Sequence, residues 1–360
     1  MIPTASRPES ARWANEASQP MHCRPGPCLI KPSVDRMPQY IEAEGHPMRV
    51  LVTGGAGFIG SHICEALLRH DAEVVVYDNL SSGSTIIDGS TFIEGDIRDL
   101  QALGMAMEGC THVCHLAALA SVPASIADPD MSEAINLQGT LNVIRAAQRS
   151  NIERIVFSST AAVYGDASEM PVSEATATKC LSPYAEHKLA AEEAVLSCGV
   201  EAVSLRYFNV HGPRQNPKGA YAAVIPAFIQ MLIEGRAPTI FGDGSATRDF
   251  VRAEDVAMLN LLALTTDDPD ALGEAYNVAS GSVMSVLELF TALRELLTEH
   301  DASIAAIEAS FAPAREGDIL HSYASIDKAI TRLGFNPETD PIRSLFATVA
   351  AYWDQHVQAG

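Results

Sequence analysis

The chain has no uninterrupted apolar stretch near the roughly 18 residues that a membrane-spanning helix needs. Its N-terminus lacks the apolar core of a secretory signal, so we expect a cytoplasmic protein with no membrane partner. Basic residues are scarce, since 24 Lys and Arg stand against 45 Asp and Glu, a net charge of −21. This balance argues against nucleic acid as a partner. It leaves room for an anionic small molecule held by a helix terminus or by single arginines.

Cysteines at metal-binding spacing are also lacking. Seven cysteines, an odd number, are scattered along the chain, which fits free thiols in a reducing compartment. Cys23 and Cys28 lie beside His22, but no second pair completes a metal site, so we expect none. Four further histidines lack paired spacing on one helix and are expected in packing or surface roles: His112, His115, His187 and His211.

Residues 1–47 differ in composition from the rest of the chain. They hold eight of the 20 prolines, show little periodicity and carry five basic and five acidic residues. We expect this segment to be disordered or loosely attached. A regular pattern begins abruptly at Met48, which we expect to be the natural start of the protein.

From Met48 onward, short β-branched runs alternate with helical stretches. This rhythm predicts a parallel sheet covered by helices on both faces, and such sheets bind ligands beyond the carboxyl ends of their strands. The predicted strands are 49–52, 73–77, 91–94, 112–116, 154–158 and 203–207, and the predicted helices are 58–69, 132–149 and 183–198.

The end of the first strand carries the glycine-rich sequence TGGAGFIG, residues 53–60. Its glycines at 54, 57 and 60 follow a strand and open a helix, so the backbone can approach a pyrophosphate at the helix N-terminus. Asp78 ends the second strand, where a carboxylate accepts hydrogen bonds from ribose hydroxyls. No arginine adjoins Asp78 and Asn79, which favours NAD over NADP. The alternative for Asp78 is a turn-forming role.

Tyr184 and Lys188 are four residues apart in a predicted helix, so the phenol and the ammonium project from one face. A tyrosine with a pKa near ~10 is a poor base, and lowering that pKa to ~7 takes roughly 4 kcal/mol. We expect the ammonium and a cationic nicotinamide ring to supply this stabilisation of the phenolate. Taken alone, the spacing is also typical of a plain surface helix.

These motifs occur together with others in a definite order: residues 54–60, Asp78-Asn79, Asp96-Ile97, Leu116-Ala117-Ala118, Asn136, Ser158-Ser159-Thr160 and Tyr184-x-x-x-Lys188. In this order they resemble the extended short-chain dehydrogenase/reductases, specifically the nucleotide-sugar epimerases. The resemblance covers 48–360. It implies a Rossmann domain over 48–207 and a smaller α/β domain, mainly 208–360, that binds the nucleotide sugar, with a discontinuous boundary. It also implies a homodimer formed through helices near 136–149 and 183–198.

The resemblance also assigns roles to single residues. The expected contacts to NAD are Gly54, Gly57, Phe58, Ile59, Gly60, Asp78, Asn79, Asp96, Ile97, Leu116, Ala117, Ala118, Asn136, Tyr184, Lys188 and Tyr207. The expected contacts to a UDP-sugar substrate are Ser121, Ser158, Ser159, Thr160, Asn209, Ala223, Val224, Arg248, Arg315 and Ser322. Arg248 and Arg315 are expected to hold the diphosphate, with structural ion pairing as the alternative.

The segment after Thr160 bears on the reaction. Dehydratases and decarboxylases of this family place an acidic residue there, whereas this chain has Ala161 and Ala162. We therefore expect 4-epimerisation through a transient 4-keto sugar. Tyr184 is the expected base, Thr160 orients the 4-hydroxyl, and Lys188 holds the nicotinamide ribose. The alternatives are a dehydratase and a catalytically silent NAD-binding regulator.

The preferred sugar substrate is expected to depend on the residues around the sugar pocket. Residues 219–226, 315–318 and His321-Ser322 resemble the UDP-N-acetylglucosamine 4-epimerases, so we expect UDP-GlcNAc and UDP-GalNAc. In related epimerases the position of Ser322 resembles a gate, and a small residue there admits both acetylated and plain hexoses. Phe228, Thr239 and Phe241 depart from the residue types of that subgroup. UDP-glucose/UDP-galactose epimerisation therefore stays open as the alternative.

Overall fold

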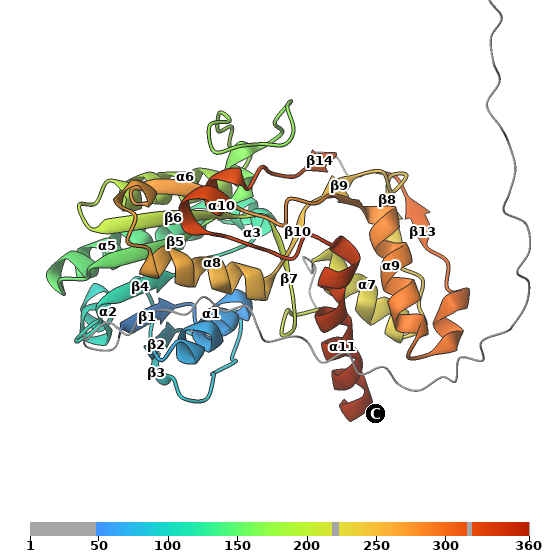
Figure 1. Ribbon diagram of the computed structural model, residues 1–360, viewed down its shortest axis with the longest axis horizontal. Helices are drawn as coiled ribbons and strands as arrows, with labels where there is room; N and C mark the ends of the chain where they lie inside the picture. The colour runs from blue at the N-terminus through green and yellow to red at the C-terminus, as the bar shows by residue number, and fades with distance from the viewer. Residues whose placement is uncertain (1–47, 218–222, 315–318, 360) are drawn as a thin grey trace, which may run out of the picture. The chain divides into compact units, whose positions relative to one another are not determined.

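The computed structural model describes residues 48–217, 223–314 and 319–359 (Figure 1). Its largest element is a seven-stranded parallel sheet with the order β11-β6-β5-β4-β1-β2-β3. The strands are β1 (Arg49–Thr53), β2 (Glu73–Asp78), β3 (Thr91–Glu94), β4 (His112–His115), β5 (Arg154–Thr160), β6 (Glu201–Tyr207) and β11 (Glu274–Val278). The predicted parallel fold is confirmed, and the six predicted strands match to within two residues. The predictions for 1–47 lie outside the described residues.

Alternate residues of each strand face opposite layers of helices. In β1, Val50 and Val52 pack on one side of the sheet and Leu51 on the other. The first side is covered by α1 (Phe58–Arg69) and α8 (Ala253–Thr265), which pack against each other (Figure 1). The second is covered by α2 (Leu100–Ala106), α5 (Thr140–Arg149) and α6 (Pro183–Leu196). Burial on both faces explains why the strands read as continuous apolar runs.

The helix predicted over 132–149 is divided in three. A short helix, α4 (Pro129–Glu133), leads into a π-helical turn (Ala134–Gly139) and then into α5. Gly139 lies so close to Ile97 that an added Cβ would be 2.5 Å from its Cδ1. The wider turn therefore brings the helix backbone against the loop that follows β3, and helical periodicity alone does not distinguish this arrangement.

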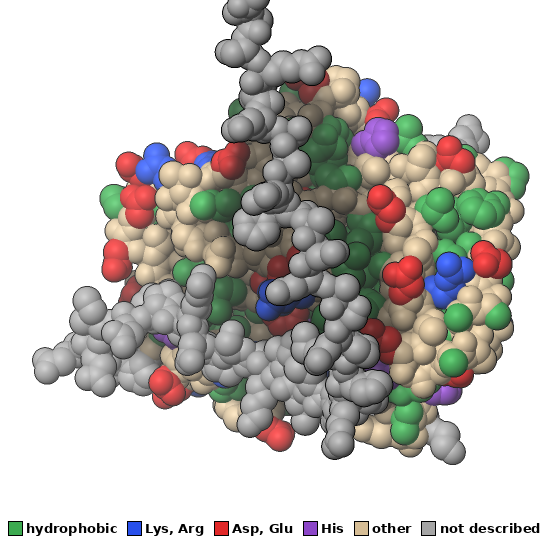
Figure 2. Space-filling model, turned by 45° about the vertical axis from the view of Figure 1, so that its right-hand side comes forward, with side chains coloured by type: hydrophobic (Ala, Val, Ile, Leu, Met, Phe, Trp, Pro, Cys, Tyr) green, Lys and Arg blue, Asp and Glu red, His purple; other side chains and the backbone are tan. Residues whose placement is uncertain are grey.

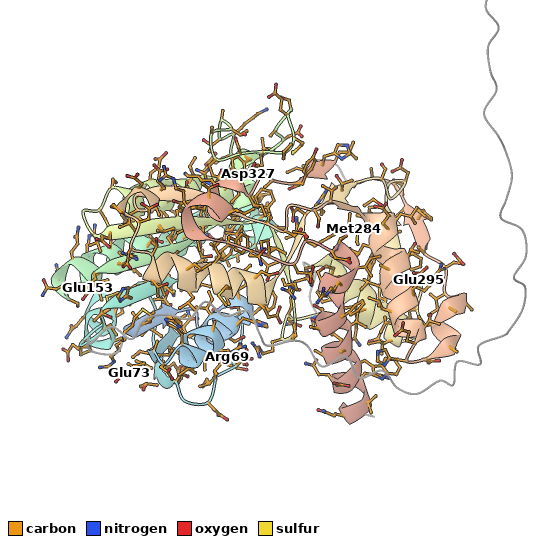
Figure 3. The ribbon with its side chains drawn as sticks, in the orientation of Figure 1. Arg69, Glu73, Glu153, Met284, Glu295 and Asp327 are labelled. Atoms are coloured by element: carbon orange, nitrogen blue, oxygen red, sulfur yellow. The ribbon has the colours of Figure 1, made fainter. Side chains whose placement is uncertain are left out.

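A second lobe is built from α7 (Val224–Ile233), α9 (Val286–Thr298) and α11 (Pro341–Ala359), which share a separate apolar core. Figure 1 shows these three helices grouped beyond one end of the main sheet, and Figure 3 places Met284 and Glu295 among them. Short strands complete it: β8 (Thr239–Phe241) with β13 (Ser310–Ala312), and β9 (Thr247–Arg248) with β12 (Met284–Ser285) and β14 (His321–Ser322).

The chain passes between the two lobes more than once. After β7 (Asn209–His211) and α7, the strand β10 (Phe250–Arg252) pairs with β7 and leads into α8, which returns to the main sheet. Strand β11 then adds to the edge of the sheet beside β6, and α10 (Asp327–Leu333) packs on it. We therefore propose a domain boundary that the chain crosses repeatedly after residue 207.

Candidate active site

A cavity of about 630 Å³ lies at the carboxyl ends of the central strands. The cavity is lined by the loops that follow β1 and β4, which are adjacent strands. After β1 the chain continues to β2 on one side of this pair, and after β4 it continues to β5 on the other side. This is the crevice at which open parallel sheets bind nucleotides. The predicted site residues that line the cavity are Gly54, Gly57, Phe58, Ile59, Gly60, Asp78, Asn79, Asp96, Ile97, Leu116, Ala117, Ala118, Ser121, Ser158, Ser159, Thr160, Tyr184, Lys188 and Tyr207.

Other predicted residues lie elsewhere. The amide of Asn136 is behind the wall, where Oδ1 accepts from the backbone N–H of Leu119 at 2.8 Å. Asn209 donates to the backbone oxygen of Asp249, and Arg248 donates to that of Thr247. The predicted residues that do not line the cavity in the described part of the chain are Asn136, Asn209, Ala223, Val224, Arg248 and Ser322. Arg315 lies outside the described residues.

The glycine-rich turn forms a close cradle at one side of the cavity. Gly54 has a left-handed φ of 73°, and a Cβ there would lie 2.7 Å from the backbone nitrogen of Ala117. A Cβ on Gly60 would lie 2.2 Å from the oxygen of Gly54. The N-cap of α1, Gly57, supplies no side-chain cap, so the first N–H groups of α1 are available to a ligand. The cradle therefore fits a dinucleotide pyrophosphate.

A carboxylate lies beside this cradle, at the end of β2. Asp78 accepts from the backbone N–H of Ala56 at 3.0 Å and from that of Leu80 at 2.8 Å, which fixes its orientation at the cavity wall. Asp96 lines the cavity as well and forms an ion pair of 2.7 Å with Arg98. Hydrogen bonds from Arg98 lower the pKa of Asp96 to about 2. The carboxylates of Asp78 and Asp96 can accept hydrogen bonds from the ribose hydroxyls of NAD and would repel the 2′-phosphate of NADP.

The Tyr184/Lys188 pair enters the cavity from the first turns of α6. Ser182 caps the helix by accepting from the N–H of Ala185 at 3.3 Å, and Pro183 occupies the first helical position. Lys188 is 2% exposed, and its Nζ lies 4.1 Å from the centroid of the Phe157 ring. Thr160, at the end of β5, lines the same cavity. The phenol, the ammonium and a hydroxyl thus converge near the glycine cradle.

The model of the NAD dependent epimerase/dehydratase family matches residues 50–279. The chain belongs to this family. The predicted family and its cofactor, NAD, are confirmed.

The similarity to known family members extends over most of the chain. A putative UDP-glucose 4-epimerase of Methanocaldococcus jannaschii is 38% identical over 299 residues, which are 81% of this chain and 94% of that protein. The UDP-glucose 4-epimerase of Lacticaseibacillus casei is 34% identical over 331 residues, covering 86% and 98%. Among solved structures, UDP-N-acetylglucosamine 4-epimerase from Methanobrevibacter ruminantium, in complex with UDP-N-acetylmuramic acid, has a TM-score of 0.79 at 38% identity. That match covers 86% of this chain and 99% of the other.

Burial dominates the ionisation of Tyr184 and Lys188. It raises the pKa of Tyr184, and the hydrogen bond from Thr160 offsets that rise only in part. Burial also lowers the pKa of Lys188 to about 7, against an opposing effect of Glu192. The expectation that Lys188 lowers the pKa of Tyr184 is therefore wrong for the protein by itself, because both groups lose their hydration in the same pocket.

A buried polar network lies directly behind the pair. Glu192, one turn after Lys188 on α6, forms an ion pair of 2.6 Å with Arg206 of β6. The same guanidinium donates to the hydroxyl of Tyr164 at 2.9 Å, which donates to Asn277 of β11 at 2.7 Å. Burial opposes ionisation of Glu192, but Arg206 outweighs this effect and lowers the pKa of the carboxyl. The network joins α6 to β6 and to the neighbouring edge strand β11.

A second network holds the wall formed by residues 116–121. The Thr53 hydroxyl lies 2.7 Å from Nδ1 of His115, and Nε2 of His115 lies 2.9 Å from the hydroxyl of Thr140. The backbone N–H of Ala117 donates to Thr53 at 3.3 Å, so the Thr53 hydroxyl is free to donate to His115. Burial, aided by Lys188, lowers the pKa of His115 to about 3, and the imidazole is neutral.

Several residues that line the cavity were not among the predicted contacts. Tyr77 lines it and donates from its hydroxyl to the backbone oxygen of Asp96 at 3.0 Å. No motif marks these positions, although their closeness in sequence to predicted contacts was an available signal. The others are Ser81, Ser82, Leu119, Ala120, Ile135, Phe208, Val210 and Gln215.

Two further properties concern the described ranges as a whole. No cluster of three or more His, Cys, Asp or Glu residues there has metal-binding geometry. Within the same ranges, no helix has both the length and the apolar character to span a membrane. Acidic side chains outnumber basic ones on the face drawn in Figure 2, in keeping with the net charge of −21.

Proposed function

We propose that the chain is an NAD-dependent UDP-hexose 4-epimerase in which Tyr184 is the acid–base residue and UDP-GlcNAc/UDP-GalNAc is the preferred pair. The observation that carries this proposal is the convergence of Tyr184, Lys188 and Thr160 in one cavity with the glycine cradle of α1. The names of the relatives support the reaction class, since proteins called UDP-glucose 4-epimerase and UDP-N-acetylglucosamine 4-epimerase both match over more than four-fifths of this chain.

In the proposed mechanism, the chain moves one proton at the sugar O4. The Thr160 hydroxyl accepts from the N–H of Ala162 at 3.2 Å. Its single hydrogen is therefore free to donate to the Tyr184 phenol or, with the substrate bound, to the reacting oxygen. Tyr184 takes the proton of the 4-hydroxyl, holds it, and returns it to the same oxygen. NAD, when bound, supplies the hydride acceptor and donor for C4. Lys188 would bind the nicotinamide ribose, and the cationic nicotinamide ring would favour the phenolate.

The segment after Thr160 supports epimerisation over dehydration. A 3₁₀ turn (Ala161–Tyr164) follows β5 directly, and its first two residues are Ala161 and Ala162. Dehydration needs an additional acid at this place, and methyl groups cannot move a proton. We therefore propose that only the 4-hydroxyl proton and the C4 hydrogen are exchanged.

The preference for an acetylated sugar rests on Ser322. This residue pairs with Arg248 in the short sheet of the second lobe. The preference is inferred from the resemblance of its position to a gate that is small in UDP-N-acetylglucosamine 4-epimerases. The similarity to UDP-N-acetylglucosamine 4-epimerase from Methanobrevibacter ruminantium supports the same choice. The UDP-glucose 4-epimerases among the relatives support the alternative, UDP-glucose/UDP-galactose.

The direct test is incubation of the purified protein with UDP-GlcNAc and UDP-glucose separately, with the C4 configuration of the products read by NMR. We expect axial and equatorial C4 epimers at unchanged mass, formed faster from UDP-GlcNAc. A product lighter by one water would contradict the assignment. Tyr184→Phe should retain NAD and lose roughly 10²- to 10⁴-fold in turnover. Near wild-type turnover in this variant would exclude Tyr184 as the base.

We further propose a cytoplasmic homodimer formed through α5 and α6. Both helices lie on the face of the sheet opposite α1 and α8, so a contact there would leave the glycine cradle accessible. Light scattering on the eluting protein gives the mass directly, and a monomeric mass at micromolar concentration would contradict this arrangement.

A further inference from the structure

The segment after β7 contains a residue with an unusual backbone. Arg214 has a φ of 69°, in the left-handed region that an L-residue with a long side chain rarely adopts. This conformation is sterically unfavourable for a residue with a Cβ, so the surroundings must hold it. Its consequence is a sharp turn. Val210 before the turn and Gln215 after it both line the cavity.

Among the described residues, the side-chain hydrogen bonds of Arg214 go to α1. Its guanidinium forms a two-pronged ion pair with Glu65, with distances of 3.1 Å and 2.9 Å, and Nε donates to the Ser61 hydroxyl at 2.9 Å. Beside it, His62 lies with Nε2 2.9 Å from the backbone oxygen of Pro213. Burial opposes ionisation of Glu65, but the hydrogen bonds from Arg214 prevail and lower the pKa of that carboxyl.

The other side of the segment is bound to α11 of the second lobe. The hydroxyl of Tyr352 donates to the backbone oxygen of Gln215. His211, which is 1% exposed, lies with Nδ1 3.0 Å from the hydroxyl of Thr348. Residues 209–215 are therefore held between α1, whose first turn faces the cofactor cradle, and α11.

We propose that Arg214 is a positioning residue that couples NAD binding at the start of α1 to nucleotide-sugar binding beside residues 210–215. The sugar half of this statement rests on the proposed function. The first ligand to bind restricts the motion of the contacts between Arg214, Glu65 and Ser61. The cavity wall at residues 210–215 is then already ordered when the second ligand binds, so the second ligand binds more tightly. An ion pair serving stability alone does not require a left-handed arginine next to two cavity-lining residues.

The backbone of Arg214 allows an unusually clean variant. Glycine adopts positive φ without steric cost, so Arg214→Gly removes the guanidinium while favouring the native turn. Arg214→Lys keeps the charge but not the two-pronged geometry. A matched control is Glu274→Gln, which breaks a 2.8 Å ion pair with Lys328 at the edge strand β11, between residues that do not line the cavity in the described part of the chain.

The measurement is the affinity of the full-length protein for NAD with and without saturating UDP, and for UDP with and without NAD. In the wild type we expect each ligand to tighten the other by the same factor, roughly 5-fold or more. Arg214→Gly should bring this factor close to 1, Arg214→Lys should give an intermediate value, and Glu274→Gln should leave it unchanged. With saturating NAD, turnover by Arg214→Gly should show a raised KM for the UDP-sugar and a smaller change in kcat.

Three results would overturn the inference. The first is a wild-type protein in which UDP leaves NAD affinity unchanged. The second is a folded Arg214→Gly variant that binds both ligands more weakly but keeps the wild-type coupling factor, since a purely structural role predicts that outcome. The third is unchanged coupling in Glu65→Gln, the variant to use if Arg214→Gly does not fold. Failure of the proposed function is separate, because it appears as absent epimerisation by the wild type, whereas coupling is measured by binding.

Discussion

The backbone N–H of Tyr184 donates a hydrogen bond of 3.1 Å to the hydroxyl of Ser125. Ser125 lies in α3 (Val122–Ala127), is completely buried, and donates in turn to the backbone oxygen of Val122 at 2.7 Å. The first turn of a helix leaves its N–H groups without partners inside the helix. A serine from a neighbouring helix therefore completes the cap of α6 at Tyr184, the proposed base.

Ser125→Ala should consequently reduce turnover. Loss of the hydroxyl leaves the N–H of Tyr184 without its partner, which costs roughly 1–3 kcal/mol, and the phenol is no longer held at one depth in the cavity. We expect kcat to fall by about 10-fold or more with little change in KM for the sugar. Ser197→Ala is the control, because the Ser197 hydroxyl donates to the backbone oxygen of Glu193 at the exposed C-terminal end of the same helix. Equal losses in both variants would contradict a specific role for Ser125.

Lys188 should make stability depend on pH in a defined direction. Its pKa is about 7 in the folded chain and 10.5 when exposed, so the unfolded chain binds more protons between these values and stability rises with pH. Below pH 7 the buried ammonium costs at most about 5 kcal/mol. Lys188→Met should therefore stabilise the NAD-free protein strongly at pH 6 and by only about 1.4 kcal/mol at pH 9.5. Urea unfolding at the two pH values measures this, and a pH-independent difference would contradict it.

Gly83 should be intolerant of a side chain. A Cβ at this position would lie 2.7 Å from the backbone oxygen of Ala56 and 2.9 Å from Cα of Gly57, in the cofactor cradle. Gly83→Ala should push this turn out of place, lower NAD affinity and destabilise the fold by about 1–3 kcal/mol. The control is Gly104→Ala in α2, where a Cβ meets nothing within 4 Å. That change should stabilise the protein by up to about 1 kcal/mol. Calorimetry with NAD titration separates the two outcomes, and unaltered NAD binding by Gly83→Ala would refute the steric argument.

Asp78 should decide between the two nicotinamide cofactors. Replacing its carboxylate with the amide in Asp78→Asn removes the repulsion toward a 2′-phosphate and weakens the hydrogen bonds to the ribose. We expect NAD affinity to drop roughly 10-fold or more while NADP affinity rises relative to it. Asp88→Asn, an exposed position in the loop that follows β2, should change neither. The preference is measured by titrating both cofactors, and an unchanged ratio for Asp78→Asn would rule out this role.

Local sequence patterns were sufficient to predict six strands of the sheet and most of the residues that line the cavity. The glycine turn, Asp78 and the Tyr184/Lys188 spacing each depend on residues close in sequence, and all of them line one cavity. Strand β11 was not predicted, because a strand that returns to the sheet after a long excursion is fixed by pairing with β6 and not by its own pattern. The same limit applies to Asn136, whose amide supports Leu119 from behind the wall.

Ionisation was harder to predict than position. The i to i+4 spacing correctly placed the ammonium of Lys188 on the same helix face as Tyr184, but spacing carries no information on burial. Desolvation depends on Phe157 and on the layers above and below the sheet. Desolvation raises the pKa of Tyr184 and lowers the pKa of Lys188, so it favours the neutral form of each group. Arg214 escaped notice for a similar reason, since its left-handed backbone follows from contacts with α1 and not from its neighbours in sequence.

The edge strand β11 lies far after its partner β6 in the sequence, and this has a consequence during protein synthesis. A nascent chain that has emerged only as far as β6 presents that strand as an open edge, and the edge stays bare while the next 66 residues are made. Unpaired edges of buried, apolar strands invite association between chains. Synthesis beyond residue 278 is therefore the point at which the sheet closes, and a product truncated before it would be prone to aggregate.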